Sequence, residues 1–252
     1  MKVTLLGCGT SSGVPRIDGR WGAADPANPK NRRRRVSIRV EEGDTSLIVD
    51  TSPDLREQCL SNNIKKIDAV LYTHDHADHT HGIDDLRGFR HAQGKLIDIY
   101  GLPETLDVLK RRFDYIFVEK LGYPPICKAH EISGNEPFRL GDITVRPFHQ
   151  IHGPIISLGY RFGKVAYSTD VSDLPDAAFE TLRGVDTWIV DALRYEPHPT
   201  HPHLAKTLGW IERVNPRRAI LTHMTGDMDY DTLRATLPPS VEPGYDGLTF
   251  EL

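Results

Sequence analysis

Hydrophobic and polar residues alternate with a period of two in the early part of the chain. Val36, Ile38 and Val40 are separated by polar residues, and an apolar arm at 47–49 follows the polar turn at 42–44. This period is typical of half-buried strands and predicts a β-hairpin. Apolar runs bounded by turn residues predict further strands at 3–6, 67–72, 142–148, 157–162, 164–168, 187–191, 218–222 and 248–252.

Helical segments are expected between these strands, and Pro53 is a typical first helical residue. The expected helices span 53–62, 84–92, 103–113, 175–183, 203–214 and 231–237. Hairpins followed by alternating strands and helices favour a layered α/β fold. No repeat or linker divides the sequence, so residues 1–252 are expected to form one domain with a sizeable core.

Composition narrows the function classes. Hydrophobic residues make up 38% and charged residues 26%, which indicates a globular chain. The 31 basic and 35 acidic residues give a net charge of −4, so neither an extended nucleic-acid surface nor a polybasic membrane anchor is expected. No apolar run reaches the roughly 20 residues of a membrane span, and no signal peptide is expected. Three scattered cysteines without a CxxC pair favour a cytoplasmic setting.

The closest grouping of metal-ligand-type residues directly follows the strand expected at 67–72. His74, His76, Asp78 and His79 form an HxHxDH pattern on a loop leaving that strand. Imidazole and carboxylate groups together suit zinc, manganese or iron. Alternate residues of an extended segment share a face, so His74 and His76 are expected to lie on one side. Asp78 and His79 would then face a second ion. Four ligand-type residues within six positions argue against a merely solvated loop.

Further ligands are expected at the ends of other strands, because each catalytic zinc usually takes about three protein ligands. His152, Asp170 and His223 each stand just after an apolar run. Taken singly, each is equally compatible with a capping aspartate or a buried core histidine. His149 lies three residues before His152 and is an alternative third histidine.

HxHxDH followed by a distant His, Asp and His resembles the signature of the metallo-β-lactamase superfamily. The resemblance implies an αββα sandwich with a two-metal site at one edge of the sheets. It favours His152 over His149, because residues 153–160 resemble the segment after the family's third histidine. The ligands that it implies are His74, His76 and His152 for the first metal, Asp78, His79 and His223 for the second, and Asp170 as a bridge between them.

A narrower resemblance covers most of the chain. Residues 6–15, Leu-Gly-Cys-Gly-Thr-Ser-Ser-Gly-Val-Pro, look like the N-terminal loop of the phosphodiesterase branch, which holds RNase Z and PhnP-type cyclic phosphate phosphodiesterases. Asp191 and the ending 244–248 are also PhnP-like. In that branch a histidine in the place of His201 protonates the leaving oxygen, and imidazole suits that role. PhnP-type members hold a structural zinc with a cysteine cluster after this loop. Residues 16–35 contain no cysteine, so no such zinc is expected.

Two other features bear on the chemistry. The four arginines at 32–35 either capture phosphate with their guanidinium groups or form a solvated turn in which they pair with nearby carboxylates. Asp50 ends a strand on the expected active edge, so it is a candidate for orienting a metal histidine from behind.

The expected function is hydrolysis of a small nucleotide-like or cyclic phosphodiester with two divalent metal ions, zinc or manganese. Asp78 would orient the attacking water and His201 would protonate the leaving oxygen. The expected partner is a small phosphorylated substrate, without membrane or extended nucleic acid, and a homodimer is compatible with the sequence. The alternatives are a thioesterase or lactonase of the glyoxalase II type and a tRNA 3′-processing endonuclease. The latter needs an extruded basic arm, which the sequence does not suggest.

Overall fold

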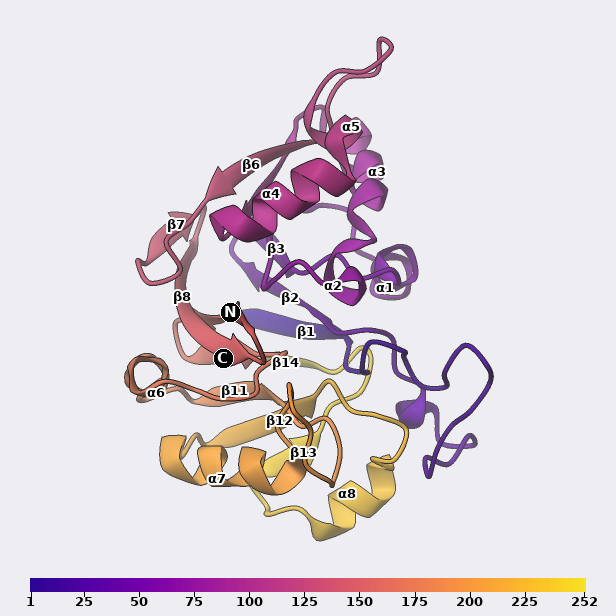
Figure 1. Ribbon diagram of the computed structural model, residues 1–252, viewed down its shortest axis with the longest axis vertical. Helices are drawn as coiled ribbons and strands as arrows, with labels where there is room; N and C mark the ends of the chain where they lie inside the picture. The colour runs from indigo at the N-terminus through magenta and orange to yellow at the C-terminus, as the bar shows by residue number, and fades with distance from the viewer.

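Two seven-stranded mixed sheets form the centre of the protein, described by a computed structural model of residues 1–252 (Figure 1). The first sheet has the order β14-β1-β2-β3-β4-β5-β6. Its strands are β1 (Lys2–Gly7), β2 (Ser37–Glu42), β3 (Thr45–Val49), β4 (Ala69–Leu71), β5 (Ile97–Gly101), β6 (Cys127–Glu131) and β14 (Thr249–Glu251). The second has the order β13-β12-β11-β10-β9-β8-β7. Its strands are β7 (Phe138–Leu140), β8 (Ile143–His152), β9 (Ile155–Phe162), β10 (Val165–Ser168), β11 (Thr187–Asp191), β12 (Arg218–Thr222) and β13 (Val241–Pro243).

Helices cover the outer face of each sheet, so the layers follow the expected αββα order (Figure 1). On the first sheet lie α1 (Leu55–Ser61), α2 (Ala77–Thr80), η2 (Ile83–Asp85), α3 (Leu86–Gln93), α4 (Pro103–Arg112) and α5 (Asp114–Phe117). On the second lie α6 (Asp176–Leu182), α7 (Leu204–Val214) and α8 (Tyr230–Thr236). A short 3-10 turn, η1 (Pro29–Asn31), belongs to the long N-terminal connection. No helix combines the length and apolar character that crossing a bilayer requires.

The core explains why the strands are so apolar. One hydrophobic cluster fills the space between the sheets, where Val3, Ile38 and Val49 of the first sheet pack with Tyr160 and Trp188 of the second. A second cluster joins the first sheet to its covering helices α1, α3 and α4. All five residues of β3 are buried, because a sheet that is covered on both faces leaves no side for water.

The backbone at one edge of the sandwich is strained in a way that positions side chains. Asp50, Asp170 and His223 follow β3, β10 and β12 and adopt positive φ angles of 64°, 50° and 58°. Non-glycine residues rarely adopt this conformation, and it costs free energy where it occurs. The chain therefore turns sharply at three strand ends and leaves a polar side chain at each, on one common edge.

Several sequence predictions differ from the structure in their bounds. The helix expected at 84–92 is the 3-10 turn η2 followed by α3, and the strand expected at 142–148 continues to His152 as the first arm of a hairpin with β9. The strands β5, β6, β7 and β13 were not predicted, since they are short or carry a weak apolar pattern. The segment between α5 and β6 projects from the body of the molecule (Figure 1), although it carries only one basic residue between Phe117 and Cys127, Lys120.

Candidate metal centre

The HxHxDH loop changes its backbone conformation in the middle, and this separates its ligands into two pairs. His74 and His76 lie on the extended segment after β4, and His76 has the extended angles φ −63° and ψ 153°. The single helical turn α2 starts at the next residue and carries Asp78 and His79. The change from extended to helical backbone points the two pairs of side chains at neighbouring positions.

All seven residues predicted as metal ligands converge at this edge. The donor atoms of one group, His74, His76, His152 and Asp170, lie within 4.8 Å of one another, and so do those of Asp78, His79, Asp170 and His223. Asp170 belongs to both groups. Its Oδ1 lies 3.0 Å from Nε2 of His79, and its Oδ2 lies 3.6 Å from Nε2 of His152. One carboxylate oxygen therefore faces each group.

The structure decides between the two candidate third histidines. Nε2 of His152 lies 3.4 Å from Nδ1 of His76. His149 is paired with Leu158 in the β8–β9 ladder, and its ring lies against Gly134, outside both groups. The odd spacing between the two histidines places their side chains on opposite faces of β8.

The donor atoms fit a divalent metal. Nε2 of His74, His79 and His223 is buried without a hydrogen-bond partner. Unpaired buried nitrogen atoms are costly, so their common direction toward Asp170 is better explained by a bound cation than by packing. Imidazole and carboxylate donors in groups of four match the ligand preferences of zinc and manganese.

The electrostatics of the centre also favour a cation. Burial opposes ionisation of Asp170, but the nearby His223 and His79 outweigh it and hold the pKa of Asp170 well below its usual range. Burial likewise opposes protonation of His223, yet Asp170 and Asp191 raise the pKa of His223 to about 9. The field of these carboxylates therefore attracts positive charge into the centre.

Outer contacts fix the orientation of the histidines. Nδ1 of His79 lies 2.7 Å from Oδ2 of Asp50, and the same carboxylate accepts a hydrogen bond from the backbone N–H of Thr73 at 2.8 Å. Asp50 thus lies behind a predicted metal histidine, as the sequence suggested. Nδ1 of His152 donates to the carbonyl oxygen of Thr200 at 2.8 Å. Such contacts leave Nε2 of each ring free to face the centre.

A histidine–aspartate pair borders the centre. Nδ1 of His201 lies 2.9 Å from Oδ2 of Asp191, and its Nε2 lies 3.8 Å from Oδ2 of Asp170. The His201 ring stacks on that of His223 with a centroid distance of 4.6 Å. The structure therefore brings the proposed proton donor to the rim of the ligand groups and fixes its direction.

Two of the four arginines at 32–35 are engaged within the protein and are not available to a phosphate. Arg33 is buried and donates to the carbonyl oxygens of Thr225, at 2.9 Å, and Met228. Arg35 pairs with Asp54, with Nε and Oδ2 3.3 Å apart. The alternative of arginines that pair locally is correct for Arg35, and Arg33 has a structural role that sequence reasoning missed.

Cys8, Cys59 and Cys127 are free and buried.

Known proteins share this architecture. Residues 45–224 match the family described as "Beta-lactamase superfamily domain". The crystal structure titled "Crystal Structure of a New Diphosphatase from the PhnP Family" superposes with a TM-score of 0.92 at 37% identity, covering 100% of this chain and 97% of that one. The chain therefore belongs to the beta-lactamase superfamily and, within it, to the PhnP family. It is an enzyme domain of the hydrolase type.

The curated relatives in this comparison are less similar in sequence than that crystal structure, and they are longer than this chain. The chain is 33% identical over 254 residues to "Octanoyltransferase" of Porphyromonas gingivalis, which covers 98% of this chain and 51% of that protein. It is 26% identical over 165 residues to "Ribonuclease Z" of Bradyrhizobium sp., covering 63% of this chain and 49% of that one. The chain thus spans about half the length of these curated relatives, and their names describe the longer proteins.

Proposed function

We propose that this chain hydrolyses a phosphodiester or diphosphate bond in a small phosphorylated substrate with two divalent ions, zinc or manganese. The ligands would be His74, His76 and His152 for one ion, Asp78, His79 and His223 for the other, and Asp170 for both. A bound metal pair supplies Lewis acidity and activates water near neutral pH. The three free, buried cysteines support a reducing compartment such as the cytoplasm.

The observation that carries the proposal is the hydrogen bond between His201 and Asp191. The Asp191 carboxylate accepts from Nδ1 and fixes the ring so that Nε2 faces the centre, where it can give a proton to an atom of the substrate. In the proposed reaction the water oxygen forms a bond to phosphorus, and the bond from phosphorus to the leaving oxygen breaks. The proton from Nε2 of His201 neutralises that oxygen, while Asp78 orients the water and receives its proton.

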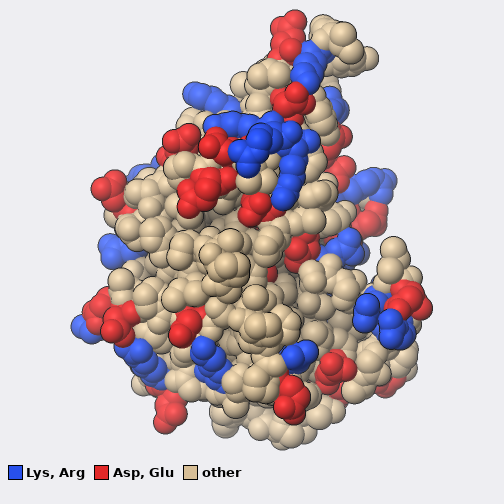
Figure 2. All heavy atoms as spheres, in the orientation of Figure 1, with Lys and Arg blue, Asp and Glu red and all other residues tan.

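This pair favours a phosphate ester over the alternatives. A thiolate leaves without protonation, so a thioesterase gains little from a fixed proton donor. A tRNA endonuclease needs a broad basic surface, whereas the chain has a net charge of −4. On the face drawn in Figure 2, acidic and basic side chains are interspersed, apart from a basic group over the end of α4. A small substrate is therefore the better match for this chain.

The test is the substitution His201→Ala, measured on two phosphodiesters. An alkoxide such as a ribose oxygen needs a proton to leave, so kcat/KM for a cyclic nucleotide should fall about 10²–10⁴-fold. Hydrolysis of bis-p-nitrophenyl phosphate should fall far less, because p-nitrophenolate leaves well unaided. Metal content should stay unchanged.

His203→Ala is the matched control, because this nearby histidine precedes α7 and its side chain makes no hydrogen bond or ion pair. It should change both rates by only a few-fold. Equal losses on both substrates, or loss of metal, would remove His201 from the acid role. Efficient cleavage of a thioester or lactone without phosphodiester turnover would move the function to that class.

A further inference from the structure

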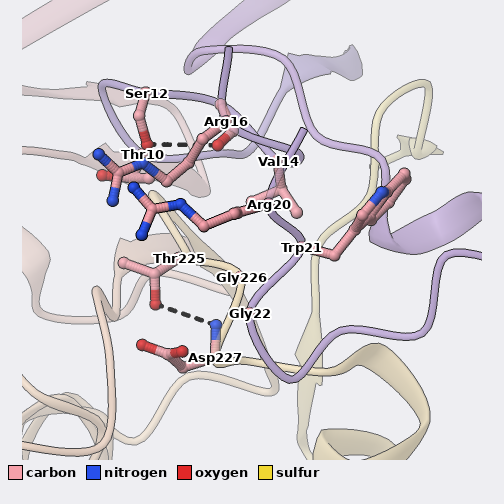
Figure 3. A pocket seen from close by; sticks show the side chains of 11 residues that line it. Thr10, Ser12, Val14, Arg16, Arg20, Trp21, Gly22, Thr225, Gly226 and Asp227 are labelled. Atoms are coloured by element: carbon pink, nitrogen blue, oxygen red, sulfur yellow. Dashed lines mark hydrogen bonds between the residues drawn. The ribbon is translucent and has the colours of Figure 1, made fainter. Parts of the chain in front are cut away.

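A pocket of about 530 Å³ lies between the N-terminal loop and the turn that follows His223 (Figure 3). Its lining contains none of the predicted metal ligands, and only two of its 11 residues are hydrophobic. The guanidinium groups of Arg16 and Arg20 extend side by side into the space above Thr225 and Asp227 (Figure 3). A polar pocket with two adjacent guanidinium groups suits an anionic ligand.

A tight turn holds the two arginines together. The backbone N–H of Arg16 donates to the carbonyl oxygen of Arg20 at 2.9 Å, and the N–H of Gly19 donates to the carbonyl oxygen of Arg16 at 2.8 Å. Gly19 adopts a positive φ of 81°, which this turn requires and glycine tolerates. The backbone therefore brings the two arginines to the same side of one turn, from which both side chains reach the pocket.

Direct backbone contacts fasten this loop to the segment of His223. The N–H of Ala24 donates to the carbonyl oxygen of Gly226 at 2.8 Å, and the N–H of Thr10 donates to that of Met224 at 3.2 Å. A Cβ atom on Gly226 would lie 2.3 Å from the carbonyl oxygen of Trp21, so no larger residue fits there. The pocket thus has a fixed position relative to a predicted metal ligand three residues away.

The charges in the pocket are available to a ligand. Arg16 makes no hydrogen bond or ion pair through its side chain, whereas Arg20 pairs with the exposed Asp18 across 2.6 Å between Nε and Oδ2. Asp227 is the one carboxylate in the lining. The Arg16 guanidinium is therefore free to bind an anion, and Arg20 can do so once it releases Asp18.

We propose that this pocket binds a second phosphoryl group of the substrate, next to the one that is attacked. The proposal rests on the proposed function and deepens it, because it assigns substrates with linked phosphates as the preferred class. Guanidinium groups bind phosphate oxygens through paired N–H donors. Arg16 binds the second phosphoryl group directly, and Arg20 exchanges the Asp18 carboxylate for it.

Binding of ADP and AMP tests the proposal without turnover. The metal-loaded wild-type protein should bind ADP about tenfold or more tightly than AMP in calorimetry, because only ADP reaches the pocket with a second phosphate. The double variant Arg16→Gln, Arg20→Gln should bind the two nucleotides equally. Arg111→Gln, which removes an exposed arginine from α4, should keep the wild-type preference. Equal wild-type affinities, or a preference that survives in the double variant, would overturn the proposal.

Kinetics separate this proposal from the proposed function. The ratio of kcat/KM for ADP-ribose to that for bis-p-nitrophenyl phosphate should fall about 10–100-fold in the double variant, mainly through KM. An unchanged ratio in an active hydrolase would reject the pocket and leave the function standing. An ADP preference that depends on the two arginines, in a protein that hydrolyses no phosphate ester, would support the pocket and reject the function.

Discussion

The two groups of ligands that share Asp170 are supported differently. Behind the group of Asp78, His79 and His223 lie two buried carboxylates, since Asp50 contacts His79 at 2.7 Å and Asp191 Oδ1 lies 3.9 Å from Nδ1 of His223. Behind the other group lie neutral oxygens, the hydroxyl of Thr73 next to His74 and the carbonyl of Thr200 next to His152. His76 of that group is exposed.

This difference gives the two groups different expected properties. Carboxylates behind a ligand increase its basicity and restrict its orientation, so the Asp78 group should hold its ion more tightly. The other group, with exposed His76, should exchange its ion more readily with solvent. A hydrolase can use both properties, since one position remains fixed while the other accepts substrate.

Removing the Asp170 carboxylate, which both ligand groups share, should abolish the difference in metal affinity between them. Asp170→Ala leaves both groups without the oxygen that faces them, so the protein should lose most of both ions and at least about 10³-fold in kcat/KM. Elemental analysis and hydrolysis of bis-p-nitrophenyl phosphate measure these effects. Asp176→Ala, which changes an exposed aspartate on α6, is the control and should keep two ions. A variant that retains both ions would contradict the bridging role.

Removing the carboxylate behind His79 should reduce the difference in metal affinity between the two ligand groups. Asp50→Asn replaces the carboxylate next to His79 by an amide, and such changes typically lower metal affinity about 10–100-fold. We expect the loss in the Asp78 group, with the other group little affected. Competition with a chelator, followed by metal analysis, should show one weakened ion per chain. Equal weakening of two ions would mean that Asp50 supports the whole centre and not one group.

The last effect concerns a carboxyl outside the centre and shows whether pH acts through the fold. Asp246 accepts hydrogen bonds from the backbone N–H groups of Arg34 and Cys8, yet burial raises its pKa from 3.8 to about 7. Between these values the unfolded chain is ionised while the folded chain keeps its proton. The free energy of unfolding should therefore fall as pH rises from about 4 to 7, by at most about 4 kcal/mol.

Asp246→Asn should flatten this slope, because asparagine does not titrate. Urea denaturation at several pH values between 4 and 8 measures it, with Asp176→Asn as the exposed control. A slope that persists unchanged in Asp246→Asn would assign the pH dependence to other groups, among them those of the metal centre.

Much of the site could be predicted because its signals are local. The HxHxDH residues lie within six positions, so their convergence needs only the backbone of one loop. His152, Asp170 and His223 could be found because parallel and neighbouring strands place their ends along the same edge. The layered α/β class followed from the alternation of apolar strands and helices, and the αββα order from the resemblance to the metallo-β-lactamase superfamily. Short strands such as β6 have too few buried residues to give a periodic signal.

Other features depended on contacts between distant parts of the chain. By itself, the sequence determined the candidate ligands and the class of chemistry, since residue types and local spacing carry that information. The segment after His152 already favoured it over His149, and the tertiary structure supplies the physical reason, because the register of β8 decides which side chain faces the centre. It also buried Arg33 and placed Arg16 on a pocket lined by the turn after His223. Arg33 donates to the carbonyl oxygen of Thr225, and Arg16 lines a pocket with that same residue, about 200 residues away in the sequence, where no local pattern reaches.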